Sequence, residues 1–427
     1  MHGGANCQKK NSPVYCKPTR MALESLVKAI EDGKTNEVLN LVGSVDLEQK
    51  HDDATPLQHA VLSENTDCVA ILLAKGAKIH PKDCETSDVR SPLHFACGLN
   101  DLDTTRLLLR HGADVHTTQK FGSIPLWETA MGDKHECVTA LLLYGTNPRH
   151  QDSISHSILH SMVLWNSVNS LKILVLWNAD PLATLPTHGL VSPSFTTPLQ
   201  RAKEARGRDC YKALKEFTTQ CKKRQQLPQK IAKLRSSIRK DDIAAVRRIM
   251  EHDADVMENH TSWPLLHIAC MSKAHQSAQF LVEHGSNVNE DYAGLTPLHM
   301  ACESNCMRCT DILIRNGANL NAMIPDVRTT PLHIASEKNN VQAMLLLLER
   351  GADVSVRDRS GFTPLHTACM WDSSLCARLL VKFEANLKAK IPKLNCTPLG
   401  IARKMNAEKC IRFLVQHKKK SKKSSEE

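Results

Sequence analysis

The stretch TPLHMACESNCMRCTDILIRNGANLNA, residues 296–322, carries the pattern that decides the fold. Thr296 and Pro297 are typical of a helix start, because a threonine hydroxyl caps free backbone N–H groups and proline fits the first helical position. An apolar stripe begins at Leu298, and a polar break at residues 303–305 ends this short helix. Residues 312–314 carry a second helix, which Gly317 ends by supplying a positive φ. Neither helix can bury its apolar face alone, so the unit requires neighbours.

Copies of this unit recur along the chain at a nearly constant spacing. The Thr-Pro-Leu start returns at Thr330, Thr363 and Thr397, at spacings of 34, 33 and 34 residues. Earlier starts lie at Thr55, Ser91, Ile124, Ser157 and Thr197. Self-similarity at this period indicates a solenoid of stacked units.

The repeated hexapeptides are TPLHMA, TPLHIA, SPLHFA and TPLHTA, and they are followed by NGAN, RGAD or HGAD turns. In these motifs the chain resembles the ankyrin-repeat family over nearly all of residues 23–417. The resemblance implies an all-α fold, an ankyrin-repeat solenoid of stacked helix-turn-helix units with β-hairpin or turn fingers. It implies the fold more strongly than the function, because repeat scaffolds host many unrelated partners.

The spacing of the units divides the chain into six segments. We expect a disordered N-terminal tail (1–20), a first ankyrin-repeat array (21–181), a Pro/Ser/Thr-rich insertion (182–196), a degenerate repeat with a basic connector (197–230), a second ankyrin-repeat array (231–417) and a lysine-rich C-terminal tail (418–427). About eleven full or partial units follow the first, capping one. The two arrays are either one bent solenoid or two separate ones, and the sequence leaves both open.

Membrane and secretory signals are missing from the sequence. No apolar run approaches the roughly 20 residues of a membrane span, and the first residues lack the apolar region of a signal peptide. We therefore expect a protein of the cytoplasm. We also expect it to be monomeric. The lysine run at residues 418–423 adds nuclear import as an alternative.

The 16 cysteines fall mostly at two positions of the repeat. Ten of them share these positions: Cys97, Cys270, Cys302 and Cys369 lie six residues after a unit start, and Cys68, Cys137, Cys210, Cys309, Cys376 and Cys410 lie thirteen residues after one. We interpret them as small buried hydrophobes, which free cysteine resembles, rather than as disulfides.

A zinc site and a catalytic site are both disfavoured. His299, Cys302, Cys306 and Cys309 have zinc-ligand spacing, but His299 occupies the motif position shared by five other units: His94, His160, His267, His333 and His366. In the family that this chain resembles, this histidine bonds backbone between units. No phosphate loop, HExxH or GxSxG motif is present. We therefore expect a protein that is not an enzyme and that needs no metal or cofactor.

A protein-binding groove is the favoured functional site. In ankyrin proteins the fingers and the first helices line a concave groove, which implies candidate contacts just before each unit start and seven or eight residues after it. The candidates are Arg90, Leu164, Trp165, Trp263, Leu295, Phe362, Met370 and Trp371. Large apolar and arginine side chains are common interface anchors, and we favour Phe362 and Trp371. The alternative for each residue is burial against the adjacent unit.

The favoured function is a non-enzymatic scaffold or adaptor that binds an unidentified partner protein. A substrate-recognition adaptor of a ubiquitin ligase is an alternative, although only ten residues follow the last unit near His417 and leave no room for a recruiting module. Nucleic-acid or acidic-partner binding is another, because residues 199–250 contain 16 Lys/Arg and 5 Asp/Glu. This segment offers few aromatic side chains for base stacking beyond Tyr211 and Phe217.

Three residues are candidate modification sites. Asn289 and Asn321 occupy the turn position that, by resemblance, is hydroxylated by an asparaginyl hydroxylase in some ankyrin proteins. Ser192 precedes a proline in the insertion, and we predict phosphorylation there by a proline-directed kinase.

Overall fold

The computed structural model describes residues 17–80, 90–119, 122–153, 156–183, 197–204, 208–223, 227–252, 264–392 and 394–423. Helices account for all of the regular secondary structure in these ranges, and they come in pairs. Finger tips are closed by isolated antiparallel bridges, for example between His51 and Ala54 and between Tyr292 and Leu295. The all-α ankyrin solenoid expected from the sequence is confirmed, with short bridges in place of longer hairpin strands.

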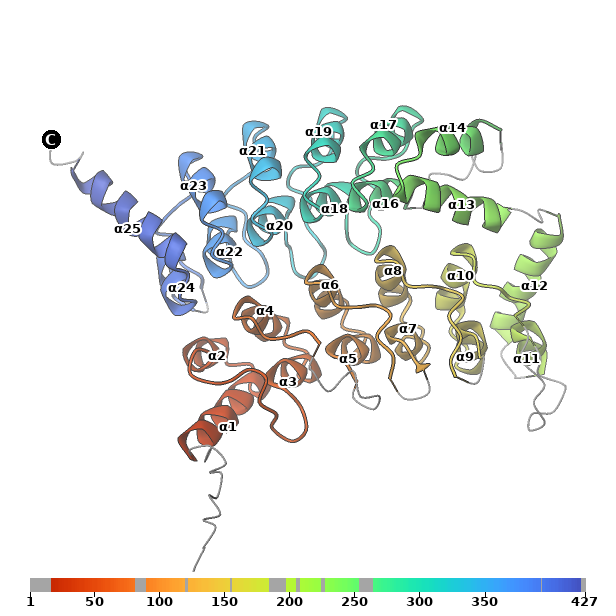
Figure 1. Ribbon diagram of the computed structural model, residues 1–427, viewed down its shortest axis with the longest axis horizontal. Coiled ribbons are helices and arrows are strands. Elements are labelled where there is room, and N and C mark those ends of the chain that lie inside the picture. Colours follow the sequence, from red (N-terminus) through yellow and green to blue (C-terminus); the bar gives the residue numbers. More distant parts are fainter. Residues whose placement is uncertain are drawn as a thin grey trace, which may run out of the picture.

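Twelve of the helices form a first stack, which we define as α1–α12 (Figure 1). Its pairs are α1 (Lys17–Glu31) with α2 (Thr35–Leu41), α3 (Pro56–Leu62) with α4 (Thr66–Ala74), α5 (Pro92–Leu99) with α6 (Leu102–Arg110), α7 (Pro125–Glu128) with α8 (His135–Leu143), α9 (Ile158–Leu164) with α10 (Val168–Leu176), and α11 (Pro198–Glu204) with α12 (Arg208–Lys223). The first helices α3, α5, α7, α9 and α11 pack side by side in that order.

The remaining described helices form a second stack, which runs from α13 to α25. Its pairs are α13 (Leu227–Arg239) with α14 (Ile243–His252), α16 (Leu265–Met271) with α17 (His275–Glu283), α18 (Pro297–Glu303) with α19 (Met307–Arg315), α20 (Pro331–Glu337) with α21 (Val341–Glu349), α22 (Pro364–Met370) with α23 (Ser374–Lys382), and α24 (Pro398–Lys404) with α25 (Glu408–Lys423). First helices again pack on first helices.

The chain folds back on itself between the two stacks. In Figure 1 the second helices α6 and α8 lie between their own first helices and the helices α16, α18 and α20 of the second stack, and α10 lies opposite α13. Contacts of Arg110 with Glu337 and of Tyr144 with Glu303 join the outer face of the first stack to the first helices of the second stack, which line its groove. The segment where the sequence predicted a basic connector belongs in part to two longer helices, α12 and α13.

Helix starts and ends follow the local chemistry that the repeat predicts. Thr55 caps α3 by accepting the backbone N–H of Gln58 at 3.3 Å, and the side chain of Gln58 accepts the N–H of Thr55 at 2.8 Å. Gly317 has a φ of 83°, the left-handed conformation expected after the second helix.

Two helices extend past predicted segment boundaries. Helix α1 begins at Lys17, inside the segment assigned to the N-terminal tail, because Leu23, Leu26 and Ile30 bury their side chains against the following repeat. Helix α25 continues to Lys423, into the segment assigned to the lysine-rich C-terminal tail.

Candidate protein-binding surfaces

The motif histidines fix the register of neighbouring units. The Nε2–H group of His333 donates to the carbonyl of Phe362 at 3.1 Å, while Nδ1 lies 2.8 Å from the hydroxyl of Thr330. His267 bonds the carbonyl of Leu295 in the same way at 2.9 Å. Burial lowers the pKa of both imidazoles to about 4, so they are neutral at pH 7. The predicted role of this histidine, a bond to the backbone of the next unit, is confirmed at these positions.

The repeat cysteines are small core residues, as the sequence predicted. All ten of them are free thiols with buried side chains: Cys68, Cys97, Cys137, Cys210, Cys270, Cys302, Cys309, Cys369, Cys376 and Cys410. Within the described ranges, no three His, Cys, Asp or Glu side chains are grouped so as to hold a metal ion.

The two stacks differ at the fourth residue after each unit start. In the second stack this position is apolar or threonine and is buried at every unit: Ile268, Met300, Ile334, Thr367 and Ile401. In the first stack the same position is mostly polar and partly exposed: His59, Phe95, Glu128, Ser161 and Arg201. The groove of the second stack is therefore filled, and the groove of the first stack is exposed.

A row of exposed apolar side chains crosses the groove of the first stack. It lies at the ends of the successive first helices α3, α5, α7 and α9, seven or eight residues after each unit start. We call it the open row, and it consists of Leu62, Leu99, Met131, Leu164 and Trp165, with exposed fractions of 44%, 37%, 51%, 56% and 50%. Equivalent positions in the second stack include Glu303, Glu337 and Trp371, which contact the first stack, so these repeat positions have different surroundings in the two halves.

An ion pair between the stacks holds Arg110, at the end of α6, against Glu337, at the end of α20. The Arg110 Nη2 atom lies 3.3 Å from Glu337 Oε2, and His111 Nε2 donates to Glu337 Oε1 at 2.8 Å. Lys338 donates to the carbonyl of Arg110 at 2.6 Å. Burial by itself would raise the pKa of Glu337. The positive charge of Arg110 has the opposite effect, and so do the hydrogen bond from His111 and the charge of Lys338. Together they hold the pKa of Glu337 well below its ordinary value.

A second polar contact lies one unit further along. The phenol of Tyr144 donates to the carboxyl group of Glu303, whose oxygens lie 2.7 and 2.9 Å away. Glu303 occupies the same repeat position as Glu337, and burial raises its pKa despite the nearby Arg110. We refer to Arg110, His111 and Tyr144 with Glu303 and Glu337 as the inter-stack contact.

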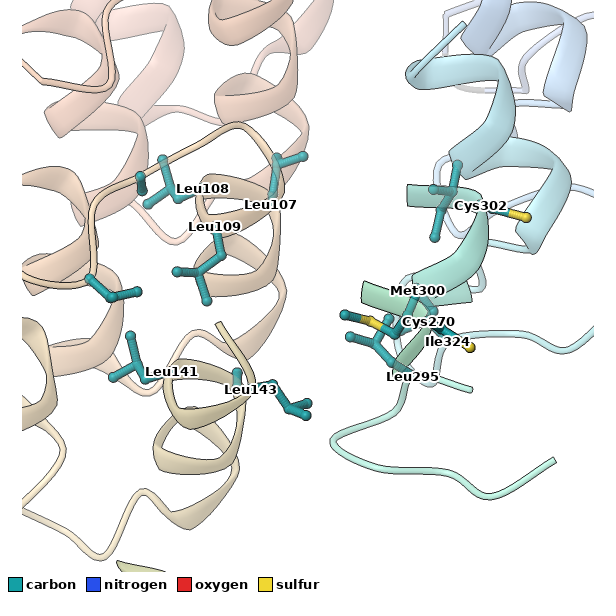
Figure 2. Packing of buried hydrophobic residues seen from close by; sticks show 14 of the residues in the cluster. Leu107, Leu108, Leu109, Leu141, Leu143, Cys270, Leu295, Met300, Cys302 and Ile324 are labelled. Atoms are coloured by element: carbon teal, nitrogen blue, oxygen red, sulfur yellow. The ribbon is translucent and has the colours of Figure 1, made fainter. Parts of the chain in front are cut away.

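Apolar packing accompanies these polar groups. Figure 2 shows Leu107 and Leu109 of α6 and Leu143 of α8 on one side, and Met300 of α18 and Ile324 on the other. All five side chains are buried and belong to one hydrophobic cluster that spans both stacks. The two halves of the chain thus share a core as well as ionic contacts.

The predicted contact residues divide between the two grooves. Leu164 and Trp165 are exposed in the open row, and the Arg90 side chain is 52% exposed beside it, 3.9 Å from Glu128. Trp371 instead stacks on His111 of the first stack, with ring centroids 4.6 Å apart and planes 14° apart. Phe362 is half-buried against the shared core.

Leu295 and Met370 correct the expectation that all of these positions face an open groove. Leu295 is fully buried and Met370 is 8% exposed, because the first stack and the neighbouring unit cover them. Trp263 lies outside the described residues. The signal that sequence reasoning missed is the apolar residue at position four of most second-stack units, together with Glu303 and Glu337 at position seven of two adjacent units.

Basic residues of the 199–250 segment are partly used inside the molecule. The guanidinium of Arg235 lies over the Trp177 ring at 3.8 Å, and burial lowers its pKa to about 10. Tyr211 and Phe217, the two aromatic side chains considered for base stacking, pack against the hydrophobic core.

The predicted modification sites differ in what the structure describes. Asn289 is exposed, donates to the carbonyl of Gly317 at 3.0 Å and accepts the N–H of Asn319 at 2.7 Å. Asn321 accepts the N–H of Asp353 at 2.9 Å. Both side chains thus bridge to the next unit, and their hydroxylation stays a prediction. Ser192 lies outside the described residues.

Comparison with known proteins agrees with this architecture. The family model "Ankyrin repeats (3 copies)" matches residues 26–119, 93–184, 234–324, 293–358 and 332–425, which together exceed half of the chain. The protein therefore belongs to the ankyrin-repeat family. In the described part of the chain, no helix has the length and apolar character needed to cross a membrane.

Among curated proteins the similarity is confined to parts of each chain. Human protein phosphatase 1 regulatory subunit 27 is 41% identical over 69 residues, 16% of this chain and 43% of that protein. Human ankyrin repeat and SOCS box protein 11 is 30% identical over 121 residues, 28% of this chain and 36% of that protein. The putative ankyrin repeat protein L371 of Acanthamoeba polyphaga mimivirus is 29% identical over 119 residues, 28% of this chain and 15% of that protein. Each match covers less than half of the relative, and ankyrin repeats as a class indicate protein–protein interaction.

Proposed function

We propose that this protein is a non-enzymatic adaptor that binds a partner protein in the groove of its first stack. The observation that carries the proposal is the open row, in which four successive units each expose an apolar side chain seven or eight residues after the unit start. Exposed apolar patches framed by polar residues are typical of protein-binding surfaces. The polar fourth-position side chains, His59, Glu128 and Ser161, lie alongside the row and would orient the partner.

The spacing of the open row favours a helical partner segment. Packed helices lie about 8–10 Å apart, so successive side chains of the row are separated by about one helix diameter. Seven residues of an α-helix rise about 10.5 Å, whereas a strand repeats the same face about every 6.6 Å. An amphipathic helix with one apolar anchor per seven residues therefore matches the row, in the helix-in-groove mode of recognition.

A peptide library tests this proposal without a known partner. A phage-displayed library of helical peptides, randomised at every position, would be selected on the full chain. We expect enrichment of apolar residues at a seven-residue spacing, and loss of selected-peptide binding in the double variant Leu164→Asp/Trp165→Asp. Arg90→Glu should change the charge preferred next to the apolar anchors.

The matched control is Leu375→Asp in α23. Leu375 is 52% exposed, similar to Leu164, but it lies on the second stack outside the open row. The proposal is supported if the selected peptides bind the Leu375→Asp variant as well as they bind the wild type, and do not bind the double variant Leu164→Asp/Trp165→Asp. Selected peptides that still bind the folded row variant would show that the site lies elsewhere.

A further inference from the structure

We propose that the groove of the second stack is a second protein-binding surface, which the first stack closes in this structure as an autoinhibitory contact. The partner that it fits presents a helical face with leucines flanked by arginine, as α6 does. This inference does not depend on the open row, because the two grooves are lined by different residues.

The composition of the inter-stack contact indicates a reversible association. The side chains of Arg110 and Glu337 are only 9% and 6% exposed, so both charges are removed from water when the stacks meet. A buried ion pair gives specificity but little net stabilisation, because desolvation offsets the attraction. Interfaces between domains of one chain resemble transient protein–protein interfaces unless they are large and apolar.

The fit between the stacks is also incomplete. The Nε atoms of Arg106 and Arg110 are buried and have no hydrogen-bond partner within the described part of the chain. A cavity of about 420 Å³ lies beside them, lined by Asp67 of α4, Asp103 of α6 and Trp371. Unpaired buried donors cost free energy in the closed form, and the pocket shows that the two facing surfaces do not meet over this part of the contact.

The open form would expose a surface suited to the stated partner. Separation of the stacks uncovers the apolar side chains Met300 and Ile334, the Trp371 ring, and the carboxylates of Glu303 and Glu337. The carboxylates lie at the ends of adjacent first helices, where they now receive Tyr144 and Arg110. An apolar helix with basic side chains at its end would satisfy the same groups.

The test uses a peptide that copies α6. The probe is a fluorescein-labelled peptide of residues 101–113, DLDTTRLLLRHGA, titrated into the full chain. The variant Arg110→Glu places a third carboxylate against Glu337 and Glu303 and should open the stacks. We expect the peptide to bind this variant at least about tenfold more tightly than the wild type, because a minor open state lowers apparent affinity by its population.

The reciprocal variant Arg110→Glu/Glu337→Arg should close the stacks again and reduce peptide binding to the wild-type level. Hydrogen exchange of the α20 amides gives the second readout, and we expect it to be faster in Arg110→Glu and normal in the double variant. Tyr144→Phe, which keeps the ring and removes one hydrogen bond, should act in the same direction with a smaller effect. Arg412→Glu reverses a charge on the exposed face of α25 and serves as the control.

Two results would overturn the inference. Equal peptide affinity for wild type and Arg110→Glu would show that the groove is not closed by the first stack. Faster exchange in α20 without tighter peptide binding would show that the stacks separate but that the uncovered groove is not a binding surface.

Discussion

Replacing Asp358 by asparagine is expected to stabilise the protein more at neutral and alkaline pH than in acid. Asp358 lies in the finger before α22, where its Oδ1 accepts the N–H of Phe362 at 2.8 Å. Burial raises the pKa of this carboxyl to about 7, and the nearby carboxylate of Asp67 on the first stack adds to the effect. Asparagine keeps the acceptor oxygen and removes the charge.

The sign and size of the effect follow from proton linkage. The folded-state pKa of about 7 exceeds the ordinary value of 3.8, so the folded state binds more protons between these two pH values. The free energy of unfolding of the wild type therefore falls as pH rises through this window. Three pKa units correspond to a ceiling of about 4 kcal/mol. Because the side chain is only half-buried, we expect about 1–2 kcal/mol after allowing for solvent screening.

The assay is urea unfolding of wild type and Asp358→Asn at pH 5 and pH 8. The variant should have the higher midpoint at both pH values, and the difference should be smaller at pH 5, which lies within the window between the two pKa values, than at pH 8, which lies above it. Asp353→Asn is the matched control, since Asp353 also accepts a backbone N–H, that of Ser355 at 2.8 Å, but is exposed. A variant that is no more stable than wild type at pH 8, or equally stabilised at both pH values, would refute the reasoning.

Three further results are expected. Trp371→Ala should lower stability by about 2–4 kcal/mol, because it removes a ring stacked on His111, whereas Trp165→Ala should change it by less than about 0.5 kcal/mol; urea midpoints of both variants check this. Gly361→Ala should cost at least about 1 kcal/mol, because Gly361 has a φ of 86° and an added Cβ would lie 2.6 Å from Pro392; thermal unfolding would show no loss if the reasoning is wrong. Asn289 and Asn321 should each carry an added 16 Da in peptides from the native source; unmodified peptides at both positions contradict the hydroxylation prediction.

The repeat itself was predictable because its determinants are local. Threonine caps, the positive φ of Gly317 and the two cysteine positions each depend on a few neighbouring residues, and each recurs in register. The same regularity placed the motif histidine at one position of each unit, whereas its role was implied by the resemblance to ankyrin proteins; His333 and His267 make equivalent bonds in equivalent units.

The arrangement of the two stacks was not predicted, because it depends on contacts between residues far apart in the chain. Arg110 and Glu337 are separated by more than six repeats, and nothing in either unit alone marks them as partners. Trp371 was favoured as a partner-binding residue because large aromatic side chains at such positions are usually anchors. In the structure the Trp371 ring does make an aromatic contact, but with His111 of the same chain and not with a partner protein.

A comparison of repeat positions could have revealed which groove is filled. Ile334 in the second stack and Ser161 in the first occupy the same position, yet one is fully buried and the other partly exposed. In an open groove the apolar side chains at the fourth position of the second-stack units would be exposed to water. An apolar side chain occupies this position in every second-stack unit except one, which has threonine. This pattern indicates that another part of the protein covers the groove.

Small-angle X-ray scattering of the full chain in solution tests the central claim most directly. If the first stack lies in the groove of the second, the radius of gyration should fall between about 22 Å, the value for a compact chain of this length, and about 26 Å. Twelve helix pairs in one extended solenoid, about 9–10 Å apart, would form a rod with a radius of gyration of about 33 Å. A value near 33 Å would contradict the folded-back arrangement, and with it the assignment of one open and one closed groove.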